Sequence, residues 1–273
     1  MMKRKTRFAT IYFMQLLFCI CGHAQNDSAY VTEHLAMGNP NNAAANIGIP
    51  GNYLMAKHQY VHSYNRFLGI PNWVAWHTDS TWLGGIRRSN HFRPDSTLPE
   101  KWYRIREGSY RGTGFDRGHL CPSADRTNTP TDNSATFLMT NMIPQAPNNN
   151  QGPWAALEIY CRDLVKQGKE LYIYCGGIGS QGFLDSGRVQ IPEKTWKTIL
   201  VLDAGEHDLL RITPSTRTIA VVMPNNNAFI GKNDDWKIFR VSVDSVEVLT
   251  GYDLFKNVAP NIQSSIERVV DNQ

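Results

Sequence analysis

The residues best suited to chemistry lie in the segment 110–120, which contains Asp116, Arg117 and His119 in close succession. A neutral imidazole has a pKa near roughly 6.5 and can accept a proton at neutral pH, so His119 is a candidate general base. The guanidinium of Arg117 carries paired N–H donors that suit phosphate oxygens. An isolated histidine beside a glycine is more often structural. The segment therefore indicates an active site only if partner residues elsewhere in the chain complete it.

A second polar cluster starts at Asn141 and continues through the asparagines of 148–150. Mg²⁺ keeps several of its waters and often takes only one or two protein oxygens, so the carboxamide of Asn150 could suffice as its direct ligand. Glu158 follows about two helical turns later and could hold metal-bound water from the same side. An asparagine run alone is more often a surface loop. Together with His119, these residues predict hydrolysis of a phosphodiester by an activated water and Mg²⁺, for which Mn²⁺ could substitute.

A basic loop upstream supplies a further candidate. The segment 84–95 holds Arg87, Arg88 and Arg93 among turn-forming residues, the most concentrated basic patch after residue 24. A solvated loop is the plain interpretation, and a loop that contacts phosphate is the functional one. Arg88, Arg117 or both could brace phosphate oxygens.

The first 24 residues have the pattern of a signal peptide. Basic residues within 3–7 precede a mostly apolar run over 8–21, and 22–24 offer small residues before a cleavage point. The apolar run is shorter than the about 20 residues that span a bilayer. We therefore predict a cleaved signal and a secreted or periplasmic protein without stable membrane association, and an uncleaved anchor is the alternative.

The charge of the remaining chain favours local attraction to polyanions over attraction by the whole molecule. Without residues 1–24 the Lys and Arg count falls from 28 to 24, which equals the Asp and Glu count of 24, and the formal net charge falls from +4 to 0. Any attraction to nucleic acid must then come from a local patch. Bulk charge neither supports nor excludes such a substrate.

The pattern of elements predicts one α+β domain. Residues 25–55 are rich in turn-forming residues and predict an irregular lead-in, and 56–273 contain no repeat, long linker or change of composition. Apolar periodicity predicts a helix from Pro153 to about Gly168, and strands surround it without regular β-α alternation. We expect a central, mostly antiparallel sheet flanked by helices. Predicted strands cover 59–64, 72–77, 171–174, 190–202, 209–212, 218–223 and 239–243, and shorter helices cover 244–250 and the chain from 261.

Three cysteines remain after residue 24, namely Cys121, Cys161 and Cys175. An odd number allows at most one intramolecular pair. A disulfide between Cys161 and Cys175 and a set of three buried thiols both fit the sequence.

The chemical segments resemble those of the DNA/RNA non-specific endonucleases, a family that includes secreted bacterial nucleases and mitochondrial endonuclease G. The segment 110–120 is similar to the family signature, and its Asp-Arg-Gly-His core is specific. The resemblance covers most of residues 55–255 through the segments 63–64, 71–74, 141–145, 150–154, 157–158 and 249–252.

The resemblance implies a ββα-metal finger that carries the active site. His119 would be the general base, and Asn150 would be the one direct Mg²⁺ ligand. Asn141 would help to orient the site, and Glu158 would anchor metal-bound water.

Two arginines complete the implied set. Arg117 looks like the family's arginine beside the metal or phosphate. Arg88 is the match for an upstream phosphate arginine, and Arg87, directly adjacent, is the alternative. The chain departs from many members at Cys121, where they have a small residue, and either a packing thiol or a redox switch would account for it.

The implied activity is that of a secreted, Mg²⁺-dependent endonuclease that cuts DNA and RNA with little sequence specificity; no oligomeric state is indicated. A nucleic-acid-binding protein of the same fold without turnover is one alternative, but it would not need His119, Asn150 and Glu158 together. A phosphodiesterase for small esters is another. It would share the chemistry but would need a closed pocket in place of an open basic groove.

Overall fold

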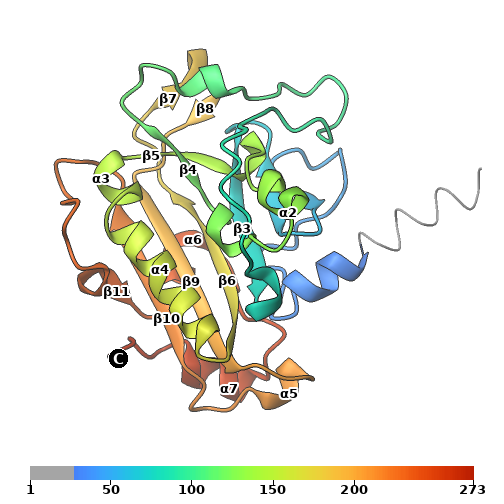
Figure 1. Cartoon of the computed structure of the whole chain (residues 1–273), viewed down its shortest axis with the longest axis vertical. Helices are drawn as coiled ribbons and strands as arrows, with labels where there is room; N and C mark the ends of the chain where they lie inside the picture. The colour runs from blue at the N-terminus through green and yellow to red at the C-terminus, as the bar shows by residue number, and fades with distance from the viewer. Residues whose placement is uncertain (1–27) are drawn as a thin grey trace, which may run out of the picture.

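A seven-stranded antiparallel sheet forms the centre of the computed structural model, which describes residues 28–273 (Figure 1). The expected signal peptide, residues 1–24, lies outside the described residues. Within that described part of the chain, no helix is both long and apolar enough to cross a bilayer. In spatial order the strands are β1 (Tyr53–Ala56), β2 (Val61–Asn65), β3 (Ile70–Thr78), β6 (Lys169–Ile178), β9 (Lys194–Asp203), β10 (Thr218–Pro224) and β11 (Arg240–Val241).

The long strands β6 and β9 form the middle of this sheet and pair antiparallel over their full lengths. β-branched and aromatic residues are frequent in both, and such side chains pack well on a pleated surface. Because successive side chains of a strand point to opposite faces, β9 contributes to two separate cores. Ile199 and Val201 pack in one apolar cluster, and Trp196, Leu200 and Leu202 pack in the other.

Helix α4 (Pro153–Lys166) covers the first of these faces and lies in front of β6 and β9 in Figure 1. Pro153 occupies its first turn, where no backbone N–H is needed. Trp154, Leu157 and Cys161 are almost fully buried against the sheet, which confirms the expected amphipathic helix. The opposite face is covered by α6 (Val243–Thr250), α7 (Pro260–Ile266) and a helix over 28–34.

A separate pair of strands carries the segment with the candidate base. β4 (Asp116–His119) pairs antiparallel with β5 (Met142–Gln145), and α3 (Pro147–Asn150) and α4 follow directly. This succession is the expected ββα finger.

The chain between β4 and β5 forms η3 (Ser123–Asp125), α2 (Pro130–Ala135) and η4 (Met139–Asn141). The remaining elements are η1 (Ser80–Trp82), η2 (Glu107–Tyr110), β7 (Phe183–Leu184), η5 (Asp185–Gly187), β8 (Val189–Gln190), α5 (Asp208–Arg211) and η6 (Trp236–Phe239).

The α+β class and the antiparallel sheet agree with the sequence prediction, whereas three local expectations are wrong. The strand expected over 209–212 is instead α5, because Arg211 folds back to bind Asp208 and closes a helical turn. The strand expected over 239–243 is reduced to β11, because Ser242 accepts the N–H of Ser245 and starts α6. The lead-in expected to be irregular contains the helix over 28–34. Cys121, Cys161 and Cys175 are all buried and free, so of the two alternatives the three buried thiols are correct.

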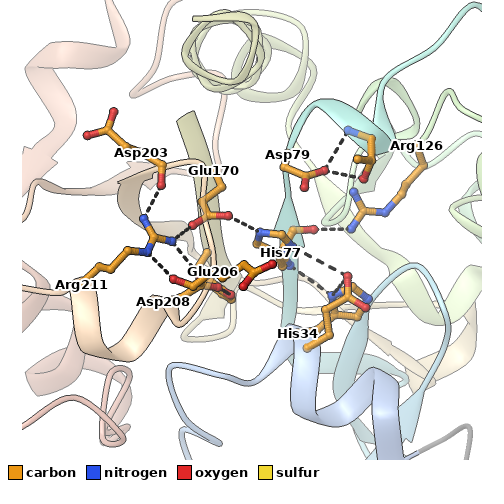
Figure 2. Close-up of polar contacts among 12 residues, drawn as sticks. His34, His77, Asp79, Arg126, Glu170, Asp203, Glu206, Asp208 and Arg211 are labelled. Atoms are coloured by element: carbon orange, nitrogen blue, oxygen red, sulfur yellow. Dashed lines mark hydrogen bonds and ion pairs between the residues drawn. The ribbon is translucent and has the colours of Figure 1, made fainter. Parts of the chain in front are cut away.

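A buried polar network ties the N-terminal helix to the sheet (Figure 2). His77, at the end of β3, lies 3.7 Å from Glu33 through Nδ1. Through Nε2 it lies 3.5 Å from Glu170. Burial by itself would lower the pKa of His77, but the hydrogen bonds and charges of these two carboxylates outweigh it and raise the pKa to about 9. His77 is therefore a cation at neutral pH.

The neighbours of His77 fix its position. His34 stays neutral because burial, with Arg126 nearby, lowers its pKa to about 3, so its Nδ1 accepts the backbone N–H of His77 at 3.2 Å. Arg126, fully buried, donates to the backbone carbonyl of His77 at 2.8 Å. On the other side, Arg211 of α5 binds the carboxylates of Glu170 and Asp208.

This network predicts that stability falls in alkaline solution. A histidine whose pKa is higher in the folded than in the unfolded state stabilises the fold fully below about pH 6.5, and this contribution is lost as pH rises toward 9. Urea unfolding of the wild type should therefore show roughly 1–3 kcal/mol less stability at pH 9 than at pH 6 from this group. His77→Gln should remove most of that pH dependence, whereas His91→Gln, at an exposed position, should keep it. Equal slopes for wild type and His77→Gln would contradict the assignment.

Candidate active site

The buried side chain of Gln145 lies so close to Gly118 that a larger residue at position 118 would clash with it. A Cβ built on Gly118 would lie 2.2 Å from Oε1 and 2.6 Å from Cβ of Gln145, a residue that is fully buried. Gly118 lies opposite Ile143, and His119 lies opposite Met142 in the ladder. The absence of a side chain at Gly118 therefore leaves room for the buried side chain of Gln145 beside the strand that carries His119.

His119 lies in an aromatic niche between the finger and the basic loop. Its ring centroid is 5.5 Å from that of Phe92 and 4.8 Å from that of Phe137, the latter edge to face. The side chain is buried, and its Nε2 atom has no hydrogen-bond partner among the described residues. Burial, followed by the charges of Arg88 and Arg117, lowers the pKa of His119 to about 3. The imidazole is therefore neutral at physiological pH.

Each candidate arginine lies over one of the two aromatic rings that flank His119. The guanidinium carbon of Arg117 is 4.2 Å from the centre of Phe92, and that of Arg88 is 4.8 Å from the centre of Phe137. Such contacts place a cation on the negative face of a ring. The two aromatic residues thus support the imidazole and both guanidinium groups at once.

Both arginines also form polar contacts, and Arg88 donates from Nε to Oδ1 of Asn90 at 2.7 Å. Arg88 donates from Nη1 to Oγ of Ser123 at 2.8 Å, and Arg117 forms an ion pair with the half-exposed carboxylate of Glu107. Burial, together with the charge of Arg117, lowers the pKa of Arg88, while Glu158 opposes that shift. The two arginines are therefore close enough for their charges to act on each other. Of the adjacent Arg87 and Arg88, it is Arg88 that lies against Phe137 and influences His119.

Backbone pairing holds the basic loop against the finger. Arg93 and Leu138 form an isolated parallel bridge, in which Met139 donates to the Arg93 carbonyl at 2.9 Å and Arg93 donates to the Phe137 carbonyl at 3.2 Å. Asn133 adds a link from α2, because its Oδ1 accepts the backbone N–H of Ser89 at 2.9 Å. These bonds fix the loop to the segment that carries Phe137.

Asn150 at the end of α3 is bound to the finger through Asp116. Its Nδ2 donates to Oδ2 of Asp116 at 2.8 Å, and Gln151 donates to the same oxygen at 2.9 Å. A carboxylate accepts hydrogen bonds only, so the amide nitrogen of Asn150 must face Asp116. The carboxamide oxygen then points elsewhere and accepts no hydrogen bond from any described residue.

This arrangement fits a hard divalent cation. Mg²⁺ prefers oxygen ligands and keeps much of its water shell, so one oriented carboxamide oxygen with carboxylates nearby is a suitable donor set. Asn150 would be the direct ligand. Asp116 would orient it, and Glu158 would accept hydrogen bonds from the surrounding water.

Asn141 lies beneath the site and is fully buried. Its Oδ1 accepts the N–H of Cys121 at 3.0 Å, while its Nδ2 donates to the carbonyls of Cys121 at 2.8 Å and of Thr136 at 2.9 Å. All polar atoms of the side chain are thus engaged with backbone. Asn141 thus fixes the backbone next to His119, and its expected part in orienting the site stays a prediction.

Glu158 projects from α4 toward the sheet, and its side chain is 15% exposed. Its Oε1 lies 3.5 Å from Nζ of Lys197. Burial raises the pKa of Glu158 and Asp125 adds to this, whereas Lys197 and Arg162 act in the opposite direction. Arg162, one turn further along α4, binds Asp125 at 2.9 Å.

A cavity of about 240 Å³ opens beside Arg117. It is lined by Glu107, Tyr110, Arg111, Phe115, Asp116 and Arg117. Four of these residues, Glu107, Arg111, Asp116 and Arg117, are charged, so the cavity can hold a polar ligand next to the finger.

The structure therefore brings together His119, Arg117, Arg88, Asn150 and Glu158, with Asn141 as support below them. Sequence reasoning missed the contacts of Asp116, Phe92 and Phe137 with the candidate residues. Asp116 could have been found, since it belongs to the same motif as His119, and Phe92 could have been found, since it lies in the loop that carries Arg88. Phe137 carries no local signal, because its contact with Arg88 joins segments distant in sequence.

Comparisons with known proteins identify the family. The family model described as DNA/RNA non-specific endonuclease matches residues 38–261. A nuclease of Nostoc sp. is 53% identical over 245 residues, which cover 90% of this chain and 88% of that protein. The mitochondrial nuclease EXOG of Danio rerio is 31% identical over 210 residues, or 72% of this chain and 59% of that protein.

A chain from a crystal structure of the EndoG/EndoGI complex shares the fold. It superposes with a TM-score of 0.71 at 23% identity, covering 84% of this chain and 93% of that chain. The protein belongs to the DNA/RNA non-specific endonuclease family. It is thus an enzyme of the hydrolase class that acts on ester bonds.

The contact at Gly118 generates a prediction about stability and activity. Gly118→Ala should destabilise the protein by about 1–3 kcal/mol, as overpacking usually does, and should lower activity by displacing His119. Thermal unfolding and a nuclease assay would measure the two effects. Gly108→Ala is the matched control, because a Cβ at Gly108 meets nothing within 4 Å. A Gly118→Ala protein as stable and active as the control would show that the strands do not need this close approach.

Proposed function

We propose that this protein is a Mg²⁺-dependent endonuclease that hydrolyses phosphodiester bonds in both DNA and RNA with little sequence specificity. One observation carries the proposal. A neutral, buried imidazole, His119, lies beside two guanidinium groups, those of Arg88 and Arg117, whose positive charges both act on it. A phosphate diester has the charge and the oxygen geometry that such a pair binds.

The residues divide the work of hydrolysis among them. His119 accepts a proton from a water whose oxygen attacks phosphorus, and the ester P–O bond on the opposite side breaks. Arg88 and Arg117 bind the non-bridging oxygens, where negative charge accumulates. A Mg²⁺ ion held by Asn150 would supply charge neutralisation at the phosphate and at the leaving oxygen.

The electrostatics of His119 link binding to catalysis. In the free site burial and the two arginines keep its pKa near 3, which makes it a weak base. A phosphate bound between Arg88 and Arg117 offsets their charge and raises the pKa of the imidazole. The base thus gains strength when the substrate is in place.

We further propose that the mature protein begins near residue 25 and acts outside the cytoplasm, in the periplasm or the medium. The basic, apolar and small-residue segments of 1–24 support this proposal. N-terminal sequencing of the protein recovered from its native host would test it, because an N-terminus at residue 1 or 2 would exclude cleavage.

The role of His119 is tested by digestion of plasmid DNA and of RNA with purified residues 25–273 and Mg²⁺. The wild type should cut both polymers, and a chelator should stop it. His119→Ala should lower the rate by roughly 10²- to 10⁴-fold, the usual cost of removing a general base. His58→Ala, at a half-exposed histidine whose ring lies 3.5 Å from Asp132 of α2, should retain wild-type activity. Wild-type cleavage by His119→Ala would assign the base elsewhere.

The role of Asn150 is tested by Mg²⁺ titration of the same assay. Asn150→Ala should raise the Mg²⁺ concentration for half-maximal rate as well as lower the rate, because it removes the proposed ligand. Asn148→Ala is the matched control on the same short helix, since Asn148 binds the carbonyl of Ile230 instead. An unchanged Mg²⁺ titration for Asn150→Ala would place the ligand at another residue.

The alternatives give distinct outcomes in these assays. A binding protein without turnover would retain nucleic acid in a mobility-shift experiment and leave it intact with Mg²⁺. A phosphodiesterase for small esters would cleave bis(p-nitrophenyl) phosphate but neither polymer. Either result would reject the endonuclease proposal.

A further inference from the structure

A lysine lies in the apolar core directly beneath the candidate site. Lys197 belongs to β9, opposite Cys175 of β6 and Val221 of β10, and is 1% exposed. It points to the face covered by α4, the face on which Ile199 of the same strand also packs. A charged amine in such a place is costly unless it is paired, so its contacts indicate what it does.

The contacts of Lys197 converge on helix α4. Its Nζ lies 4.1 Å from the ring centre of Trp154 and 5.7 Å from that of Trp76, both almost fully buried. The only carboxylate within ion-pair distance of it in the described part of the chain is Glu158, at 3.5 Å from Oε1. The amine is therefore held by two indole rings and directed at one carboxylate.

Glu158 depends on this lysine because its other neighbours are already engaged. Arg162 on the same helix is bound to Asp125 at 2.9 Å, and Asp125 also accepts the indole N–H of Trp76 at 3.1 Å. Arg88 from the basic loop acts on Glu158 through space and forms its hydrogen bonds elsewhere. Lys197 is thus the cation that pairs with Glu158.

We propose that Lys197 is a positioning residue of the active site, which holds the Glu158 carboxylate ionised and turned so that Oε2 remains available to the water around the bound metal. This inference rests on the proposed nuclease function for its catalytic consequence. The geometry itself does not depend on that function. Lys197 approaches Oε1 from the sheet side, and no described residue forms an ion pair with Oε2.

The pairing with Glu158 explains why a lysine occupies position 197, where burial of an apolar side chain would cost less free energy. Burial raises the pKa of Glu158, and the carboxylate of Asp125 adds to the rise. Lys197 provides the largest opposing effect. A neutral carboxyl would be a poorer acceptor for metal-bound water, so the buried amine preserves the charge that the site uses.

The test compares Lys197→Met, which keeps the length of the side chain and removes its charge, with Lys197→Arg, which keeps the charge. Lys197→Met should lower the nuclease rate by about 10- to 100-fold, the usual cost of losing a group that supports a metal site, and should raise the Mg²⁺ concentration for half-maximal rate. Lys197→Arg should recover part of both. Lys169→Met, at a surface lysine paired with Asp203, should change neither.

A double-mutant cycle separates positioning from packing. If Lys197 acts through Glu158, Lys197→Met should cost little further rate in a Glu158→Gln background, because the charge to be positioned is already gone. Circular dichroism and thermal unfolding would establish that each variant is folded. Equal rate losses in both backgrounds, or an unchanged Mg²⁺ titration for Lys197→Met, would overturn the proposal.

A readout without activity distinguishes this inference from the proposed function. In the metal-free protein with ¹³C-labelled glutamate, the carboxyl signal absent from Glu158→Gln identifies Glu158, and its titration gives the pKa. Lys197→Met should shift that pKa upward relative to wild type. A wild type that cuts no nucleic acid but shows this shift would reject the nuclease and keep the pairing, whereas the same Glu158 titration in both proteins would reject the pairing.

Discussion

The active site is organised by two guanidinium groups held beside one imidazole. Like charges at close range repel, so Arg88 and Arg117 would move apart if nothing restrained them. The rings of Phe92 and Phe137 restrain them, and the contacts with Ser123 and Glu107 complete their surroundings. The site thus maintains a positive field that an anion would relieve. Such prearranged charge needs no reorganisation when a substrate binds, which is how electrostatic catalysis works.

That field persists because the finger below it cannot shift. The approach of β4 to Gln145 at Gly118 fixes the strand that carries His119, and Asn141 fixes the backbone of Cys121 just beyond it. The Arg93–Leu138 bridge then fixes the basic loop to the same unit. Each of these contacts joins segments distant in sequence. Rigidity at the site is therefore a product of the tertiary fold.

The difference between local patterns and contacts of distant segments explains which features could be predicted from the sequence. The helix α4 could be predicted because its apolar periodicity is strong. His119, Asn150 and Glu158 could be proposed from the sequence because a motif and helical spacing carry their signal locally. Lys197 could not be found, since a lysine in a strand is ordinary unless its burial is known. The failure at 209–212 has the same origin, because the contacts of Arg211 with Glu170 and Asp208 outweigh the strand propensity of that segment.

The balance of charges in residues 25–273 limits the kind of recognition that this site can perform. Residues 25–273 carry no formal net charge, and in physiological salt exposed charges act over only about 8 Å. Under the proposed function, attraction to the substrate would then arise at contact distance, from Arg88, Arg117 and the bound metal. Contacts of this type reach phosphate oxygens, which are the same at every nucleotide and carry no sequence information. A site that depends on them discriminates poorly between sequences, and it has no need to discriminate between DNA and RNA unless a further group reads the 2′-hydroxyl.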